Sequence, residues 1–295
     1  MKVLVCGGAG FVGRAVVKAL QANGHEVVLG VSRVRAGGVV QVMVDYAKDT
    51  DPSVWLPRLQ GIDAVVNAVG VLRTSGARPI EAVHAATPKA LWQACAQAGV
   101  RRVVQISALG VDHANTQYAQ TKRQADEALW ALDKAGQLSA VVVRPSVVFG
   151  KGGASSALFM ALARLPLLVL PLPMVSARVQ PVAVGDLADA VAALLGAHIA
   201  QRGLVTAVGP TPVAMADWVV SLRAQLGSGK PTVWGLPMAL TRLSARMGDL
   251  VPGVPWCSET LAMLGSDNVG EVAGFEALIG RTPVAPDQLV EHAWR

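Results

Sequence analysis

The chain has 295 residues, of which 52% are hydrophobic and 16% charged, and this composition excludes a disordered protein. Its length accommodates one large or two modest domains. The net charge of +6 comes from dispersed basic residues without long runs or interleaved aromatic residues, which argues against nucleic acid as a partner. Three scattered cysteines, no grouped metal ligands and a strand directly after Met1 favour a cytoplasmic protein without a metal or a signal peptide.

The first 145 residues alternate between strand and helix patterns. Strands are predicted over residues 3–6, 26–31, 41–44, 63–69, 103–107 and 140–144, and helices over residues 13–22, 80–98 and 116–135. This alternation is typical of a parallel sheet with helices on both faces. It predicts an α/β fold, with a doubly wound domain over residues 1–150.

The pattern changes from residue 151 onward. Proline becomes frequent and the predicted segments shorten, so we expect a smaller α+β region over residues 151–295 that covers a substrate. Helices are predicted at residues 186–197, returning to the first domain, and at residues 215–226.

Residues 157–174 are almost continuously apolar, but they include Arg164 and three prolines, so a membrane-spanning helix is excluded. Two interpretations stay open. The segment is either a helix and loop packed between the domains, or an exposed apolar lip that contacts a membrane or admits a lipophilic substrate. A lip of the second kind would make the protein peripheral to the inner face of a membrane.

A glycine-rich turn follows the first predicted strand, with Gly7, Gly10 and Gly13 in the spacing of a dinucleotide-binding turn. The first glycine permits a tight turn, the second lets backbone approach a pyrophosphate, and the third lets the helix pack against the strand. The helix N-terminus then directs N–H groups and partial positive charge at the phosphates. The sequence therefore predicts a Rossmann domain that binds a dinucleotide.

The residues after the second strand bear on which dinucleotide binds. An NAD site usually places a carboxylate there for the ribose 2′-hydroxyl. This chain instead has Ser32, Arg33 and Arg35, and arginine suits a 2′-phosphate. The sequence therefore favours NADP(H) over NAD(H), the alternative being a solvated loop.

Tyr118 and Lys122 are four residues apart near the start of the predicted helix 116–135, so they share one helical face. Ser107 ends the strand before that helix. A lysine below the phenol, with the positive ring of an oxidised nicotinamide, would favour the phenolate and lower the tyrosine pKa for proton transfer. The alternative is that both residues lie on an ordinary amphipathic surface helix.

Seven segments along the chain carry a combined signature. They are Gly7–Gly13, Asp63–Gly70, Gln105–Gly110, Tyr118–Lys122, Val143–Gly150, Gln180–Asp186 and Ser266–Asn268. As a set they resemble the extended or atypical branch of the short-chain dehydrogenase/reductase superfamily, which is epimerase/dehydratase-like. Within it, the chain most resembles the subfamily of the nucleotide-binding accessory subunit of respiratory complex I and its bacterial relatives.

The resemblance implies roles for the matching positions. The pyrophosphate would be wrapped by Gly7, Gly10, Phe11, Val12 and Gly13. The adenosine side would be lined by Asp45, Asn67, Ala68 and Gly70. The nicotinamide would be backed by Pro145, Val147 and Val148. The reactive residues would be Ser107, Tyr118 and Lys122, of which Tyr118 and Lys122 would also contact the cofactor.

Two positions depart from the pattern of the resembled family. His84 stands where many extended relatives carry an asparagine, and a lone helical histidine is interpreted as a packing residue. Arg178 is shifted by one position from the phosphate-binding arginine of sugar-nucleotide enzymes.

Three functions are consistent with these features. The first is an NADP(H)-dependent oxidoreductase acting on a carbonyl/alcohol pair, with a small and lipophilic substrate such as a quinone or an isoprenoid-like molecule. The second is a structural or sensory protein that binds NADPH without turnover. The third is a nucleotide-sugar epimerase or dehydratase, which would recycle its hydride. The oligomeric state stays open.

Overall fold

The computed structural model describes residues 1–34, 36, 38–74, 78–196, 201–251, 256–264 and 266–294. The chain forms two compact units. Unit 1 comprises Met1–Val111, Gln117–Arg144 and Ala188–Val205, and unit 2 comprises Asp112–Thr116, Pro145–Leu187 and Thr206–Arg295.

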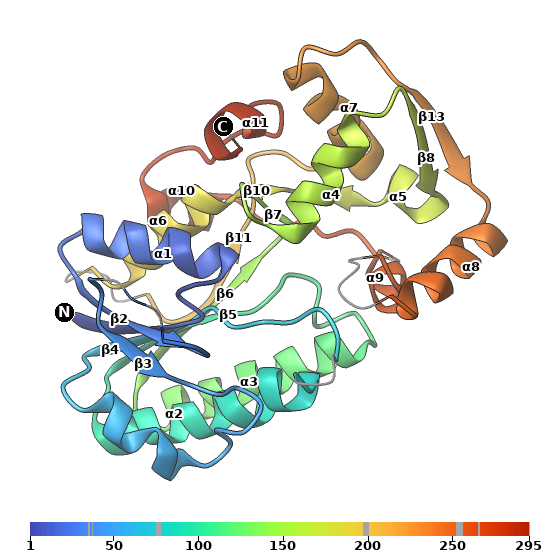
Figure 1. The fold of residues 1–295 in the computed structure, drawn as a ribbon. Coiled ribbons are helices and arrows are strands. Elements are labelled where there is room, and N and C mark those ends of the chain that lie inside the picture. The colour runs from blue at the N-terminus through green and yellow to red at the C-terminus, as the bar shows by residue number, and fades with distance from the viewer. Residues whose placement is uncertain are drawn as a thin grey trace. The chain divides into compact units, whose positions relative to one another are not determined.

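A seven-stranded sheet forms the centre of unit 1, in the order β11-β6-β5-β4-β1-β2-β3 (Figure 1). The strands are β1 (Lys2–Cys6), β2 (Glu26–Val31), β3 (Gln41–Met43), β4 (Ala64–Asn67), β5 (Arg102–Ile106), β6 (Ser139–Pro145) and β11 (Gly203–Ala207). All pairs from β3 to β6 are parallel. The predicted doubly wound α/β fold is therefore confirmed, with β11 as a strand that the sequence patterns did not indicate.

The central strands are apolar along most of their length because helices cover both faces of the sheet. Val3, Leu4 and Val5 of β1 are fully buried, and so are residues 140–143 of β6. Such continuous burial is characteristic of parallel strands between two helical layers. Figure 1 shows α2 (Thr87–Ala98) and α3 (Gln117–Lys134) on one face and α1 (Phe11–Ala22) and α6 (Val184–Leu194) on the other.

Arg102 joins the end of α6 to the sheet. Its Nε and Nη2 atoms donate to the carbonyl oxygen of Leu194, and Nη1 donates to Ser139 Oγ and to the Gln201 carbonyl. A guanidinium at this position satisfies a carbonyl that a helix C-terminus leaves unpaired. These contacts hold Leu194, at the end of α6, and Gln201, just before β11, next to β5.

The predicted helix over residues 80–98 begins with a wider turn than expected. Residues Ala82–Ala86 form a π-helix that continues into α2. A π-turn inserts one extra residue into a helix and is frequent at functional sites. Here it contains His84, which is almost fully buried.

Unit 2 contains shorter elements around an aromatic core. They are β7 (Val148–Phe149), α4 (Ala154–Ala163), β8 (Leu167–Pro171), α5 (Leu172–Ser176), β9 (Arg178–Val179), β10 (Val182–Ala183), β12 (Val213–Ala214), α7 (Met215–Gln225), β13 (Thr232–Leu236), α8 (Met238–Asp249), α9 (Ser258–Met263), α10 (Ala273–Ile279) and α11 (Leu289–Ala293). The ring of Trp218 lies 5.7 Å from that of Phe149 and 4.6 Å from that of Phe159. These fully or nearly buried rings anchor the unit.

Residues 157–174 form the end of α4, the strand β8 and the start of α5. The prediction of a loop after the helix is wrong. The segment instead contains strand β8, which pairs in parallel with β13, 65 residues further on. Leu168 and Leu170 of β8 are buried, whereas Leu167 and Val169 between them are exposed. In the parts of the chain that the structure describes, no helix combines the length and apolarity needed to cross a bilayer.

Candidate functional site

The glycine-rich turn joins β1 to α1 and requires glycine at two positions. Gly7 has a φ of +79°, and its N–H donates to the carbonyl oxygen of Gly30 on the neighbouring strand β2. A Cβ at Gly13 would lie 2.0 Å from the Gly7 carbonyl oxygen, which no side chain tolerates. A Cβ at Gly10 would lie 3.1 Å from the same oxygen. The turn therefore has the compact backbone that is typical of dinucleotide-binding turns, with the N-terminus of α1 directly after it.

We expect Gly13→Ala to lower the free energy of unfolding by about 1–3 kcal/mol, because the new methyl group overlaps the turn backbone. Dinucleotide affinity should fall with it, as measured by denaturant unfolding and by fluorescence titration with NADPH. Gly185→Ala is the matched control, since a Cβ there has nothing within 4 Å. Equal NADPH affinity in the two variants would contradict a phosphate-binding turn.

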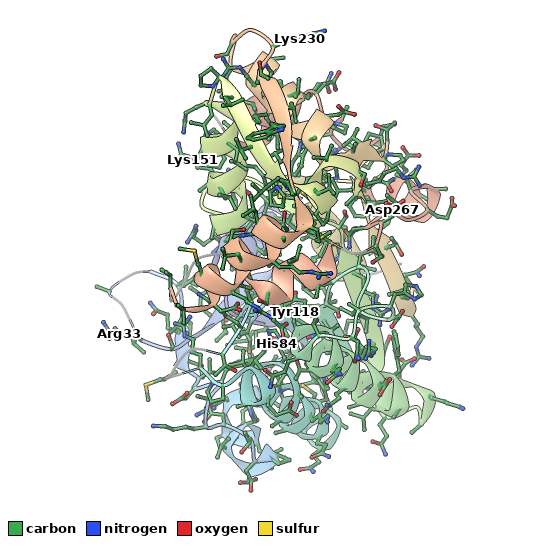
Figure 2. The ribbon with its side chains drawn as sticks, turned by 90° about the vertical axis from the view of Figure 1, so that its right-hand side faces the viewer. Arg33, His84, Tyr118, Lys151, Lys230 and Asp267 are labelled. Carbon is green, nitrogen blue, oxygen red and sulfur yellow. The ribbon has the colours of Figure 1, made fainter. Side chains whose placement is uncertain are left out.

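Ser32 and Arg33 follow β2 and are exposed. Because β1 and β2 are adjacent and parallel, these residues lie at the same sheet edge as the glycine turn. Figure 2 shows Arg33 on the loop that leaves this edge. Arg35, the other predicted phosphate ligand, lies outside the described residues.

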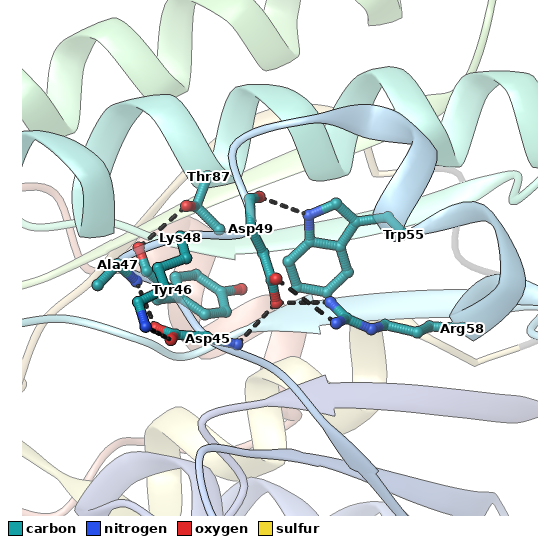
Figure 3. Close-up of polar contacts among 8 residues, drawn as sticks. All are labelled: Asp45, Tyr46, Ala47, Lys48, Asp49, Trp55, Arg58 and Thr87. Atoms are coloured by element: carbon teal, nitrogen blue, oxygen red, sulfur yellow. Dashed lines mark hydrogen bonds and ion pairs between the residues drawn. The ribbon is translucent and has the colours of Figure 1, made fainter.

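Asp45 lies in a tight turn after β3 that Asp49 holds in place (Figure 3). The Asp49 carboxylate accepts from the Asp45 N–H at 2.6 Å and pairs with Arg58, while the Asp49 carbonyl accepts from Trp55 Nε1 at 2.9 Å. The Asp45 carboxylate itself accepts from the Ala47 N–H and is about half exposed. The turn therefore presents Asp45 to solvent on a fixed backbone.

Asn67 ends β4, and its side chain is committed to the protein interior. Its Oδ1 accepts from the Tyr46 hydroxyl at 2.8 Å and from the Val69 N–H at 3.2 Å, and its Nδ2 donates to Gln105 at 2.8 Å. These bonds tie together the carboxyl ends of β4 and β5. The Asn67 side chain is therefore engaged within the protein. Ala68 and Gly70, which follow it, would offer their backbone groups to a ligand.

Lys122 is buried on α3, one turn after Tyr118, as the i, i+4 spacing predicts. Its Nζ donates to the carbonyl oxygen of Ile106 at 3.1 Å. Ile106 is the last residue of β5 and directly precedes Ser107. A Cβ on Gly70 would lie 3.6 Å from the same Nζ atom. Burial lowers the pKa of Lys122 to about 8. The ammonium thus lies between the ends of β4 and β5, at the sheet edge that carries the glycine turn.

The pKa of Tyr118 in the protein alone is raised. Burial and the negative charge of Asp126 raise this pKa to about 12. In the protein alone the phenol is therefore protonated at neutral pH. The lowered pKa expected from Lys122 together with the positive ring of an oxidised nicotinamide stays a prediction for the protein with bound cofactor.

Ser107 belongs to a buried network that the sequence reasoning missed. Its Oγ donates to Asp126 Oδ2 at 2.8 Å, and the same oxygen accepts from Arg144 Nη2 at 3.0 Å. Asp126 and Arg144 are 0% and 4% exposed, so the ion pair is shielded from water. Because the Ser107 hydroxyl donates its hydrogen to Asp126, its oxygen can accept a further hydrogen bond. The missed signal is spacing: Asp126 follows Lys122 by four residues, on the same face of α3.

His84 packs against Tyr118 from the π-helical turn, and Figure 2 shows the two side chains together. Their ring centroids are 5.2 Å apart with the planes at 82°. The Val71 N–H donates to His84 Nε2 at 2.9 Å, which leaves the proton on Nδ1, 3.3 Å from Thr121 Oγ1. Burial and the charge of Lys122 lower the pKa of His84 to about 2. His84 is therefore neutral and positions the Tyr118 ring.

The remaining predicted residues lie in unit 2. Pro145 ends β6, Val147 follows, and Val148 begins β7. Arg178 is exposed and pairs with Asp267 at 2.9 Å, so its charge is already engaged. The described ranges contain no group of three or more His, Cys, Asp or Glu side chains that could hold a metal ion.

Comparison with known proteins agrees with this architecture. The profile of the NAD dependent epimerase/dehydratase family matches residues 3–203, and the chain belongs to that family. A 2-alkyl-3-oxoalkanoate reductase from Stenotrophomonas maltophilia is 30% identical over 179 residues, which are 52% of this chain. The match also spans only about half (52%) of that relative.

Solved structures show the same fold at low sequence identity. UDP-glucose 4-epimerase from Thermus thermophilus, in complex with NAD, is 20% identical, with a TM-score of 0.66 over 95% of this chain and 98% of its own. UDP-glucuronic acid 4-epimerase from Bacillus cereus, in complex with UDP-glucuronic acid and NAD, is 16% identical, with a TM-score of 0.72 over 99% of this chain and 98% of its own. The similarity covers nearly the full length of all three chains.

Proposed function

We propose that the protein is an NADP(H)-dependent oxidoreductase that interconverts a carbonyl and an alcohol on a lipophilic substrate. The observation that carries the proposal is that Tyr118 lies one turn before the buried Lys122 on α3, and that the Lys122 Nζ lies at the carboxyl ends of β4 and β5. The glycine turn after β1 lies at the same edge of the sheet. Ligands of open parallel sheets bind beyond the carboxyl ends of the strands.

The chain's own residues fit a dinucleotide and a proton transfer. Gly7, Gly10 and Gly13, with the backbone of Phe11 and Val12, would hold the pyrophosphate. Reduction of a carbonyl needs a hydride at carbon, which a bound nicotinamide supplies, and a proton at oxygen, which the Tyr118 phenol supplies. Lys122 would hold the cofactor ribose and counter the charge that develops on the phenol. Ser107, whose hydroxyl donates to Asp126, would accept a hydrogen bond from the alcohol hydroxyl of the substrate or product. By the resemblance to the family, Pro145, Val147 and Val148 would back the nicotinamide.

Cofactor preference is assigned to Ser32, Arg33 and Arg35. We expect Arg33→Ala to weaken NADPH binding about tenfold or more, the worth of a charge-assisted contact to phosphate, and to leave NADH binding nearly unchanged. Calorimetric titration with both dinucleotides measures the difference. Arg101→Ala is the control, because Arg101 precedes β5 at the opposite end of the strands. Equal losses for NADPH and NADH would overturn the preference, and NAD(H) would then be the cofactor.

The substrate class is supported by similarity and by composition. The relative from Stenotrophomonas maltophilia is named a reductase of an oxo acid that carries an alkyl chain, over about half of either protein. The chain has few charged residues and an almost continuously apolar segment at residues 157–174, which favours a substrate with an alkyl, quinone or isoprenoid-like group. Steady-state oxidation of NADPH with 3-oxo acids and quinones tests the proposal.

Two alternatives predict different results in that assay. A non-catalytic NADPH-binding protein, as in the complex I subfamily that the sequence resembles, would retain its cofactor and oxidise none of it. An epimerase or dehydratase would convert a nucleotide sugar without net consumption of cofactor. This second alternative is supported by the fold of nucleotide-sugar epimerases.

A further inference from the structure

Helix α8 in unit 2 has its large apolar side chains turned toward solvent. Leu240, Leu243, Met247 and Leu250 are 51–82% exposed, and their spacing of three, four and three residues places them on one helical face. We call these four residues the α8 stripe. A soluble helix normally turns such a face inward, so the reversal needs an explanation.

The opposite face of α8 is buried, and its contacts fix the orientation of the helix. Thr241 and Ala245 are fully buried, and Gly248 is buried beside them. A Cβ on Gly248 would lie 2.0 Å from the Trp256 carbonyl oxygen, so the helix packs through its smallest residues. Asp249 accepts from the N–H and hydroxyl of Ser258 and fixes the helix end. The stripe is therefore presented outward by specific contacts and not by loose packing.

A second apolar surface directly precedes α8. Strands β8 and β13 pair in parallel, with Val169 opposite Trp234. Trp234 is 62% exposed, and Leu167 and Val169 are also exposed. Only Pro237 separates the end of β13 from α8. Exposed tryptophan beside aliphatic side chains is typical of the interface between water and a bilayer.

Basic residues outnumber acidic ones in the sequence around the stripe. Residues 218–249 contain four Lys or Arg and one acidic residue, Asp249, which is bonded to Ser258 at the end of α8. Arg242 and Arg246 lie on α8 beside the stripe, and Lys230 stands just before β13 (Figure 2). An apolar helical face bordered by arginines is the pattern of helices that lie on anionic membranes.

We infer that the α8 stripe, with Trp234 and Val169, adsorbs to the surface of an anionic lipid bilayer. Apolar side chains would enter the boundary between headgroups and acyl chains, while Arg242 and Arg246 would contact lipid phosphates. The interaction is independent of whether the protein turns over a substrate. It places the membrane contact mainly at residues 232–250, with residues 167–169 beside it, and not along the whole of 157–174.

The test is co-sedimentation of the full chain with phosphatidylcholine vesicles that contain phosphatidylglycerol, and with phosphatidylcholine vesicles alone. We expect binding to the first kind only, weakened by added salt. Arg242→Gln combined with Arg246→Gln should lower the partition coefficient on the order of 30-fold, at about fivefold for each cationic residue. Arg101→Gln with Lys134→Gln removes the same charge from unit 1 and should leave vesicle binding nearly unchanged.

The apolar part is tested with Leu243→Ser combined with Met247→Ser, which should abolish sedimentation while far-UV circular dichroism stays the same. Leu204→Ser, at an exposed leucine of β11, is the control. Brominated lipids should quench the wild-type tryptophan fluorescence more than that of Trp234→Phe. Absence of vesicle binding, binding that ignores phosphatidylglycerol, or a stripe that instead drives self-association in analytical ultracentrifugation would each overturn the inference.

Discussion

Replacing Tyr118 by phenylalanine should abolish carbonyl reduction while leaving the fold and dinucleotide binding in place. The substitution removes only the hydroxyl, and loss of a positioned proton donor lowers kcat by about 10²–10⁴-fold. The pKa of Tyr118, raised to about 12, means that the wild-type phenol is protonated throughout the neutral range. Stopped-flow or steady-state NADPH oxidation with an accepted substrate measures the effect.

The control for this variant is its NADPH affinity, which should match that of the wild type. The ring contact with His84 is also preserved in a phenylalanine, so the positioning of the ring is unchanged. Unchanged turnover would remove Tyr118 from the reaction. A wild-type protein that oxidises no NADPH with any carbonyl, yet binds it tightly, would favour the non-catalytic alternative.

Asp126→Ala should lower the free energy of unfolding by about 3–5 kcal/mol, because it leaves the Arg144 guanidinium buried without its partner. For a chain of this size the melting temperature should fall by about 10 °C. Ser107 would also lose the acceptor of its hydroxyl proton. Denaturant titration and calorimetry measure the loss.

Two comparisons separate burial from charge. Asp267→Ala breaks the exposed pair with Arg178 and should cost less than about 1 kcal/mol, since solvent screens both groups. Asp126→Leu combined with Arg144→Met removes both buried charges and should recover much of the lost stability. Equal stability losses for Asp126→Ala and Asp267→Ala would show that the buried pair contributes nothing special.

Much of the fold is predictable because its signals are local. Strands β1 and β6 are continuous apolar runs, and a run of that length between helical patterns indicates a buried parallel strand. Strand β11 has no such signal, because its pairing beside β6 depends on chain about 60 residues away and on Arg102. Pairing of β8 with β13 is equally remote in sequence. The π-turn at Ala82–Ala86 is missed for a similar reason, because it differs from an α-helix only in hydrogen-bond register.

For the candidate site, sequence reasoning gives residues better than it gives their chemistry. The spacing of Tyr118 and Lys122 correctly placed both side chains on one face of α3. The raised pKa of Tyr118 in the protein alone could not be predicted from spacing, because desolvation depends on everything packed around the phenol. Asp126 and His84 act through tertiary contacts to residues far along the chain. The roles assigned to the glycine turn, Arg33 and Asp45 stay predictions that ligand titrations test.

The return of residues 188–205 to unit 1 has a consequence for how the protein is made. Strand β6 is synthesised about 60 residues before β11, its neighbour in the sheet. A nascent chain that has released only β1 to β6 therefore presents an open edge of hydrogen-bonding groups next to apolar side chains. The sheet can be completed only after β11 has been synthesised and Arg102 has formed its hydrogen bonds to the end of α6. The strand order therefore leaves the edge of β6 unpaired during translation, and that edge has to be protected from aggregation until β11 is made.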